Sequence, residues 1–148
     1  MEALLISACL LGADCKYSGG NNALPGETLA ALRGRWRLIP VCPEVAGGLS
    51  VPRLPSERRG ERVVSRTGED VTAAFLAGAS DAAALAERFG CGIALLKERS
   101  PSCGSGEIYD GSFSGRLVPG WGAAAEKLRG AGIRVLGESR VPELLENG

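Results

Sequence analysis

The stretch ALLISACLLG, residues 3–12, decides the fold of this chain. Its apolar run over residues 3–8 has the length of one buried strand, and Cys9 to Gly12 indicate a turn after it. Similar apolar runs occur at residues 36–41, 92–97 and 133–136, separated by helical spacing at residues 25–34, 71–90 and 123–129. Strands that alternate with helices predict a single Rossmann-like α/β domain: a mostly parallel sheet of about four strands with flanking helices.

Two parts of the chain lie outside this alternation. Residues 46–62 carry several glycines and prolines and are expected to be irregular, while residues 62–72 predict a small hairpin that turns at Thr67 and Gly68. The long segment ERSPSCGSGEIYDGSFSG, residues 98–115, follows the third predicted strand and is expected to be a loop. No internal repeat or linker interrupts the chain, so we expect one domain over residues 1–148.

The size and the ends of the chain favour a cytoplasmic protein. Its 148 residues suit one domain, and no apolar run approaches the ~20 residues that span a bilayer. Glu2 precedes the first apolar run, which has no basic residues before it, so the run predicts a buried strand and not a signal peptide. The five cysteines are an odd number, which favours a reducing compartment over a disulfide framework.

The charge balance argues against extended contact with nucleic acid. Seventeen basic and seventeen acidic residues give a net charge of zero, whereas proteins that grip many phosphates usually carry a basic excess. The densest basic stretch has five arginines (Arg53, Arg58, Arg59, Arg62 and Arg66) interleaved with Glu57, Glu61 and Glu69. We interpret that stretch as a solvated loop.

The chain contains no histidine, which excludes His-based catalytic triads, Cys–His dyads and HExxH zinc sites at once. Any chemistry must therefore use cysteine, carboxylate, hydroxyl or basic side chains, or a cofactor. No segment matches GxGxxG or a Walker A motif, so nucleotide binding by those routes is unsupported.

Three cysteines are expected at one edge of the sheet. The first and second predicted strands run into Cys9 and Cys42, and Cys103 follows the third strand by six residues. Because parallel sheets bind ligands at the carboxyl ends of their strands, these thiols belong where sites are built. Three thiolates without histidine suit a soft metal or an iron–sulfur cluster. Cys91 opens the third strand at its other end and is assigned to packing, while Cys15 is a fourth ligand, a supporting thiol or a mere neighbour.

Three oxygen-bearing side chains accompany these cysteines. Glu44 lies two residues after Cys42, where a carboxyl group beside an anionic cluster is suited to proton transfer, or it is a glutamate that lies at the surface or anchors a loop. Ser100 and Ser102 flank Pro101 just before Cys103, and their hydroxyls can donate to bound sulfur or oxygen or merely cap the loop.

Several motifs in order resemble the thiouracil desulfidase (TudS) family, long catalogued as a bacterial and archaeal domain of unknown function. They are SACLLG with Cys15-Lys16-Tyr17, PVCPEVAGGL, PR-x-P-x-E at residues 52–57, GEDVT at 68–72, and KERSPSCG-x-G-x-IYDG-x-FSG. The resemblance covers nearly the whole chain, and this combination is specific. One departure is Ser18, where the family commonly has Asp, which puts the role of the first loop in doubt.

The resemblance implies an iron–sulfur enzyme. Cys9, Cys42 and Cys103 would hold a 4Fe–4S cluster whose fourth iron, lacking a protein ligand, can take the substrate's sulfur. The implied reaction is the non-redox desulfuration of thiolated uracil bases or nucleosides, which releases hydrogen sulfide and leaves the oxo base. Glu44 and Ser100 match catalytic positions, and Ser102, Cys15 and Tyr17 are expected to contact the substrate. Such clusters are oxygen-sensitive, so an aerobically prepared structure could lack one.

Two other functional hypotheses remain open at this point. Cys9 and Cys15 could cycle as a pair in a thiol redox or sulfur-transfer protein. The same three cysteines could instead hold zinc in a non-enzymatic binding module, although they are far apart in sequence, unlike the paired cysteines of structural zinc sites.

Overall fold

The centre of the molecule is a sheet of four parallel strands. The structure is a computed structural model that describes residues 1–146, so the last two residues of the expected domain lie outside it. The strands are β1 (Ala3–Ser7), β2 (Arg37–Val41), β5 (Ile93–Leu96) and β8 (Arg134–Gly137), in the order β2-β1-β5-β8. All three pairings are parallel, which confirms the predicted fold class.

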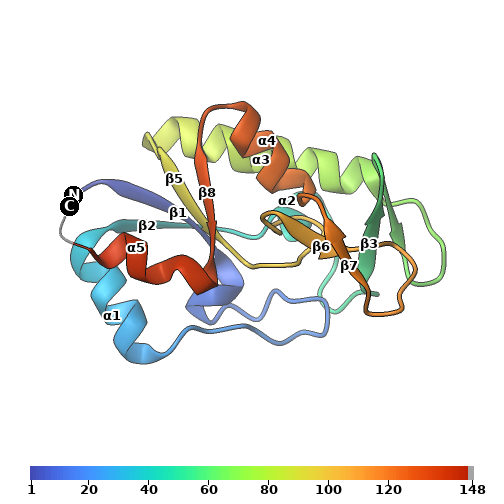
Figure 1. The fold of residues 1–148 in the computed structure, drawn as a ribbon, viewed down its shortest axis with the longest axis horizontal. Helices are drawn as coiled ribbons and strands as arrows, with labels where there is room; N and C mark the ends of the chain where they lie inside the picture. Colours follow the sequence, from blue (N-terminus) through green and yellow to red (C-terminus); the bar gives the residue numbers. More distant parts are fainter. Residues whose placement is uncertain (147–148) are drawn as a thin grey trace.

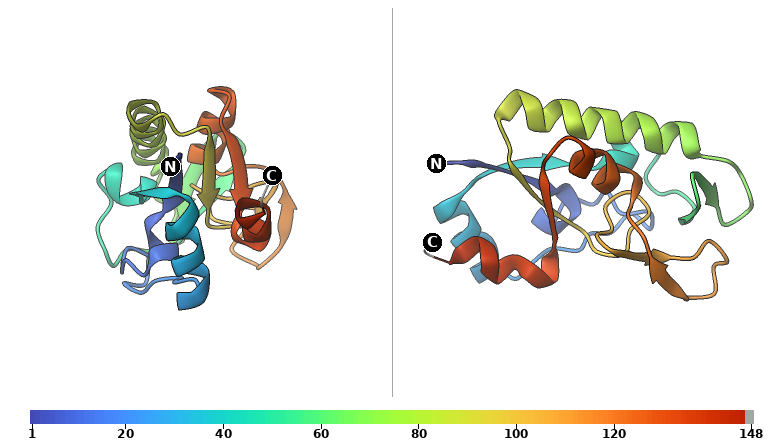
Figure 2. Two further views of the ribbon diagram at one scale, coloured as in Figure 1. Left: turned by 90° about the vertical axis from the view of Figure 1, so that its left-hand side faces the viewer. Right: turned by 45° about the horizontal axis from the view of Figure 1, so that its top comes forward.

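Helices cover both faces of this sheet (Figures 1 and 2). On one face, α3 (Thr72–Phe89) and α4 (Ala123–Gly130) pack in a cluster that includes Leu5, Ala94 and Val135. On the other face, α1 (Gly26–Arg35) and α5 (Val141–Leu145) pack against Leu4, Ile6 and Leu95. Successive residues of a strand point to opposite faces, so a strand covered on both sides must be apolar at every position. This requirement explains the unbroken run at the start of the chain.

The remaining elements lie mainly at the carboxyl end of the sheet. Two antiparallel hairpins form there, one from β3 (Ser56–Arg59) and β4 (Arg62–Ser65), the other from β6 (Glu107–Tyr109) and β7 (Leu117–Pro119). Short helical segments complete the described chain: η1 (Ala8–Leu11), α2 (Pro43–Ala46) and η2 (Glu138–Arg140).

The predicted turn at Thr67 and Gly68 is present, and it brings Asp70 opposite Val64 in an antiparallel bridge. The prediction was incomplete, because β4 also pairs with β3 in a hairpin that joins Arg59 to Arg62 and turns at Gly60 and Glu61. Gly60 has φ of 61° and Gly68 of 90°, so both turns use the left-handed backbone that glycine allows. The β6–β7 hairpin was not predicted: β6 lies inside the segment that was expected to be a loop, residues 98–115, and β7 follows that segment.

The interpretation of the arginine-rich stretch as a solvated loop is wrong in two respects: Arg58, Arg59 and Arg62 lie in the strands of the β3–β4 hairpin, and two of the five arginines are shielded from solvent. The Arg53 side chain is only 9% exposed and pairs with Glu44, and the Arg58 side chain is 15% exposed and pairs with Glu126. Arg58 also donates to the carbonyl of Trp121 at 2.6 Å. Arg62, which pairs with Asp70, remains largely exposed as expected. The buried arginines therefore hold segments together across the fold.

None of the helices over residues 1–146 combines the length and apolar character that crossing a bilayer requires.

Candidate functional site

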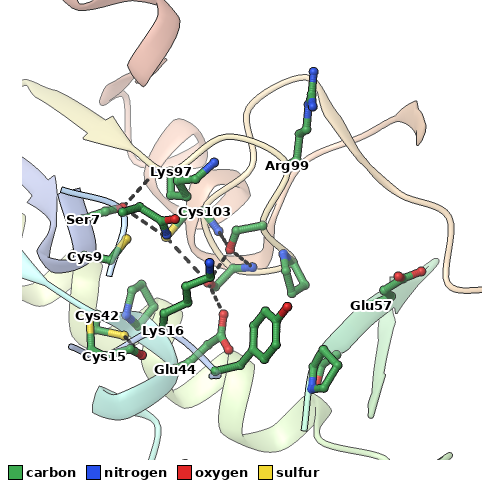
Figure 3. Close-up of a pocket in the computed structure, with 18 of the residues that line it drawn as sticks. Ser7, Cys9, Cys15, Lys16, Cys42, Glu44, Glu57, Lys97, Arg99 and Cys103 are labelled. Atoms are coloured by element: carbon green, nitrogen blue, oxygen red, sulfur yellow. Dashed lines mark hydrogen bonds between the residues drawn. The ribbon is translucent and has the colours of Figure 1, made fainter. Parts of the chain in front are cut away.

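The strand order places a crevice beside the end of β1. The chain passes from β1 to β2 on one side and later returns to β5 on the other, so connections diverge at the carboxyl ends of β1 and β5. Ligands of open α/β sheets bind at such switch points. Here the crevice is a cavity of about 550 Å³. The cysteines predicted as ligands, Cys9, Cys42 and Cys103, all line it (Figure 3).

Each of these cysteines is placed by the strand before it. Cys9 lies in η1, directly after β1, and Cys42 immediately precedes α2 at the end of β2. Cys103 lies in the turn that follows β5 and is buried. Figure 3 shows their sulfur atoms at the end of the pocket nearest the sheet, with Cys15 beside Cys42. The structure therefore brings together the three thiols that the strand-end argument selected.

These thiols influence one another through their charges. Burial raises the pKa of Cys103 to about 12, and the nearby Glu44 and Cys9 charges add to that effect. Burial also raises the pKa of Cys9, and repulsion from Cys42 contributes. At neutral pH the Cys9 and Cys103 thiols are consequently protonated when no cation is bound. A positively charged metal group would remove that penalty, because thiolates are its ligands and protons are released on binding.

Two serine hydroxyls approach the sulfur of Cys103. Ser7, at the end of β1, accepts a hydrogen bond from the backbone N–H of Lys97 at 2.9 Å and donates its proton toward Cys103 Sγ at 3.4 Å. The Ser102 hydroxyl lies 3.6 Å from the same sulfur. The hydrogen bond from Ser7 stabilises the thiolate and lowers the Cys103 pKa in opposition to burial.

Glu44 stands at the end of a chain of hydroxyls. Its Oε2 accepts a hydrogen bond from Ser102 at 2.8 Å, and Ser102 lies 2.9 Å from the Ser100 hydroxyl. Since the Ser102 proton points to the carboxylate, the Ser100 hydroxyl is the donor in the second contact. Ser100 Oγ also accepts the N–H groups of Ser102 and Cys103, each at 3.1 Å. Ser100 thus caps its turn and belongs to the hydroxyl chain at the same time.

The second oxygen of Glu44 is held by Arg53. Arg53 Nε donates to Glu44 Oε1 at 3.0 Å, and Arg53 Nη2 donates to the carbonyl of Cys15 at 2.9 Å. Both oxygens of the carboxylate therefore have partners, one from the loop that carries Cys103 and one from the stretch after α2.

The first loop lines the pocket beside Cys42. The Cys42 thiol donates to the carbonyl of Cys15 at 3.8 Å. Burial raises the pKa of the Cys15 thiol to about 12, and the neighbouring Cys42 and Cys9 add to that effect. Tyr17, predicted to contact the substrate, also lines the pocket and is 44% exposed. Cys91 lies in the apolar cluster between the sheet and α3, which confirms its assignment to packing.

The far wall of the pocket comes from both hairpins. Glu57 of β3 accepts the backbone N–H groups of Gly111 and Phe113 through one oxygen, at 3.0 and 3.1 Å. This carboxylate docks the loop between β6 and β7 onto β3. Phe113 and Arg99 are the non-glycine residues with positive φ over residues 1–146, at 58° and 68°, and both line the pocket. Such strained backbone is concentrated at functional sites.

The donor set fits an iron–sulfur cluster better than a single ion. No group of three or more His, Cys, Asp or Glu side chains over residues 1–146 is arranged to hold one metal ion. Cys9, Cys42 and Cys103 nevertheless share one cavity, and all are free thiols. Thiolates spread around a cavity suit a group with several iron atoms, because each iron needs only one of them.

Sequence reasoning did not identify several residues that shape the site. Apolar patterning marks Ser7 only as the end of a strand, and charge patterning places Arg53 in a solvated loop. Lys97, Glu57 and Phe113 were not selected either, although all three line the pocket. The PR-x-P-x-E and IYDG-x-FSG motifs contained the available signal for Arg53, Glu57 and Phe113, but spacing alone does not say what each side chain contacts.

Comparisons with known proteins point to one family. The model of the 2-thiouracil desulfurase family matches residues 4–140. The chain is 38% identical to the uncharacterized protein YbbK of Bacillus subtilis (strain 168), over 96% of this chain and 99% of YbbK. Among solved structures it is similar to the [4Fe-4S]-dependent thiouracil desulfidase TudS, with 48% identity and a TM-score of 0.93. That match covers 97% of this chain and 95% of the TudS chain.

Proposed function

This chain belongs to the 2-thiouracil desulfurase family, and we propose that it removes sulfur from thiolated uracil bases or nucleosides with a 4Fe–4S cluster held by Cys9, Cys42 and Cys103. The products are hydrogen sulfide and the oxo base. The observation that carries this proposal is the convergence of the three thiols in one cavity, which the Glu44 carboxylate also lines. Both burial and the nearby Glu44 charge raise the pKa of Cys103.

The reaction is a hydrolysis without net redox change: the thiocarbonyl C=S and water become C=O and H₂S. A cluster bound by Cys9, Cys42 and Cys103 would supply a Lewis-acidic iron without a protein ligand, which would polarise the thiocarbonyl group of the substrate.

In this proposal, Glu44 is the residue that accepts a proton during the reaction. Its carboxylate lies in the same pocket as the thiols, its side chain is only 15% exposed, and the chain has no histidine that could move the proton instead. Glu44 accepts the proton of the attacking water. The Ser102 hydroxyl, 2.8 Å from Oε2, aligns the carboxylate, and Ser100 donates to Ser102 in turn. We assign Glu44 as the general base and Ser100 and Ser102 as the hydroxyl chain that orients it and the substrate.

The remaining pocket residues hold the substrate. Tyr17 and Cys15 form the wall of the first loop, and the pocket also contains Phe113 on the docked hairpin loop. A cavity of about 550 Å³ suits a small molecule, and the net charge of zero favours a free base or nucleoside over a long nucleic acid. We place the protein in the reducing cytoplasm, because all five of its cysteines are free.

Anaerobic reconstitution tests the function directly. The purified chain is incubated with iron and sulfide, its absorbance near 400 nm is recorded, and 2-thiouracil and 4-thiouracil are assayed for loss of the thiocarbonyl and release of sulfide. We expect iron uptake and sulfide release in equal amounts with uracil. A folded protein that takes up no iron, or that takes up iron without consuming either base, contradicts the proposal. One zinc and no iron per chain instead favours the binding-module hypothesis.

The role of Glu44 is tested by Glu44→Gln. Loss of the general base is expected to lower kcat by about 10²–10⁴-fold while the cluster absorbance stays at the wild-type level. Glu61→Gln, in the exposed turn of the β3–β4 hairpin, is the matched control and should leave kcat unchanged. Wild-type turnover by Glu44→Gln would remove this residue from the mechanism.

A further inference from the structure

The Arg53 side chain is hydrogen-bonded to several segments that line the site, unlike the side chain of a solvated loop. Its guanidinium donates to three acceptors from different segments: Glu44 Oε1 at 3.0 Å, the Cys15 carbonyl at 2.9 Å and the Ser50 carbonyl at 3.1 Å. Its backbone N–H donates to the carbonyl of Tyr17 at 2.8 Å. One residue thus joins the first loop, the start of α2 and the stretch after α2.

The burial of this ion pair makes it more than a surface contact. The side chains of Arg53 and Glu44 are only 9% and 15% exposed. Exposed pairs contribute little, because water and mobility compete with them, whereas a shielded pair with fixed geometry holds its partner in place. The planar guanidinium also presents its donors in fixed directions, which a lysine ammonium cannot do.

Glu44 depends on this arrangement for its orientation. Ser102 holds only Oε2, so without Arg53 the carboxylate can turn about that single hydrogen bond. The carbonyl of Cys15 that Arg53 binds also accepts the Cys42 thiol, so the same guanidinium sets where the first loop lies relative to Cys42. Misplacement of a catalytic group by about 1 Å is enough to lower turnover by about 10²-fold.

We propose that Arg53 is a positioning residue for the desulfuration reaction: it aims the Glu44 carboxylate into the pocket by holding Oε1 while anchored to the Cys15 and Ser50 carbonyls. This inference rests on the proposed function and deepens it. Arg53 does not touch the reacting atoms in this role, and it acts on turnover through Glu44.

A double-mutant cycle tests whether the action runs through Glu44. Reconstituted wild type, Arg53→Met, Glu44→Gln and the double variant are compared in kcat, KM and iron content. We expect Arg53→Met to lower kcat by about 10- to 100-fold with KM changed less than about threefold. In the Glu44→Gln background the same substitution should lower kcat by less than about threefold, because the residue it positions is already disabled.

A matched control separates positioning from general stabilisation. Arg58 comes from the same arginine-rich stretch and is similarly buried, but it binds the Trp121 carbonyl and Glu126 and does not line the pocket. Arg58→Met should lower the thermal midpoint of unfolding and leave kcat near the wild-type value. If Arg53→Met does not fold, Arg53→Lys takes its place in the cycle, since it keeps the charge but loses the three-way fork.

The outcomes distinguish this inference from the proposed function. Arg53→Met with kcat within about threefold of wild type overturns the positioning role, as does a loss that multiplies fully with that of Glu44→Gln. A loss of kcat that only follows lost iron also overturns it. In each of these cases the wild-type activity still stands. If the reconstituted wild type itself does not release sulfide, the proposed function fails first.

Discussion

Identical side chains in this protein have different roles because their surroundings differ. Cys91 and Cys103 are both buried, but Cys91 packs among alanines, while Cys103 faces the pocket and is approached by the Ser7 and Ser102 hydroxyls. A buried thiol without polar neighbours behaves as a small apolar side chain. A buried thiol that accepts a hydrogen bond from a hydroxyl, as Cys103 does from Ser7, is better suited to lose its proton. At the residue scale, polar neighbours therefore distinguish Cys103, the proposed ligand, from Cys91.

Substitution of Cys15 distinguishes its proposed place in the pocket wall from a role as a redox-active thiol. Cys15→Ser is expected to keep the cluster and to lower activity by no more than about tenfold. The reason is that Cys15 serves Cys42 and Arg53 through its backbone carbonyl, which serine retains. Iron content and sulfide release are the measurements, with Cys42→Ser as the control that should lose both. Complete loss of activity in Cys15→Ser with normal iron content would instead favour a Cys9/Cys15 thiol cycle.

At the scale of elements, the short helix α2 is held by backbone contact with α3. A Cβ atom built on Gly78 of α3 would overlap the carbonyl of Pro43, and one on Gly47 would overlap the carbonyl of Ala74. Glycine at both positions lets the two backbones touch. Because α2 begins next to Cys42 and carries Glu44, this contact positions two site residues at once.

Gly78→Ala tests that contact. The added methyl group is expected to push α2 away from α3 and to lower the free energy of unfolding by about 1–3 kcal/mol, with reduced iron retention. Gly34→Ala in α1 is the control, because a methyl group on Gly34 would meet no atom within 4 Å and alanine favours the helix. Urea unfolding and iron content measure both effects. Equal stability of the two variants would show that the α2–α3 interface accommodates a methyl group at Gly78, which contradicts the prediction.

The start of α3 depends on one carboxylate. Hydrogen bonds from the Thr72 hydroxyl and backbone N–H, together with Arg62, lower the pKa of Asp70 to about 2. A lowered pKa means that this stabilisation is present above the ordinary value of 3.8 and is lost as the pH falls toward 2.

Asp70→Asn is therefore expected to lower the unfolding midpoint at pH 6, and the difference from wild type should shrink as the pH falls from about 4 to about 2. Asp81→Asn, at an exposed position in the middle of α3, is the control. The measurement is the denaturant midpoint of each protein across this range. A difference that stays constant with pH would mean that Asp70 acts through packing and not through its charge.

At the scale of the whole molecule, net charge and pocket size bear on the substrate. Seventeen charges of each sign leave no excess to attract a polyanion, and the reactive end of the pocket lies beside buried strand ends. The kcat/KM for thiouracil is expected to change by less than about twofold between about 50 and 500 mM salt, since no set of counterions is released on binding. A steep decline with salt, or faster turnover of thiolated transfer RNA than of the free base, would contradict the preference for small substrates.

Much of the architecture was predictable from local pattern. The four apolar runs and the helical spacing between them led to the parallel sheet, because a strand covered on both faces must be apolar throughout. The same logic placed Cys9, Cys42 and Cys103 together, since parallel strands end at one edge. The turn at Thr67 and Gly68 was also predictable, whereas the β3–β4 hairpin that turns at Gly60 was not, because the polar strand β3 carries no apolar strand pattern.

The sequence by itself therefore determined the sheet, the edge at which the site forms and the thiols that meet there, all of which follow from the direction and periodicity of strands. Only the tertiary structure decided how that site is held. Ser7 reaches Cys103 across 96 residues, Ser102 reaches Glu44 across 58, and Glu57 reaches Phe113 across 56. Such contacts depend on the paths of irregular loops, whose sequences show no repeating apolar pattern from which a path could be predicted. They also depend on which buried donor lies nearest once the chain has folded.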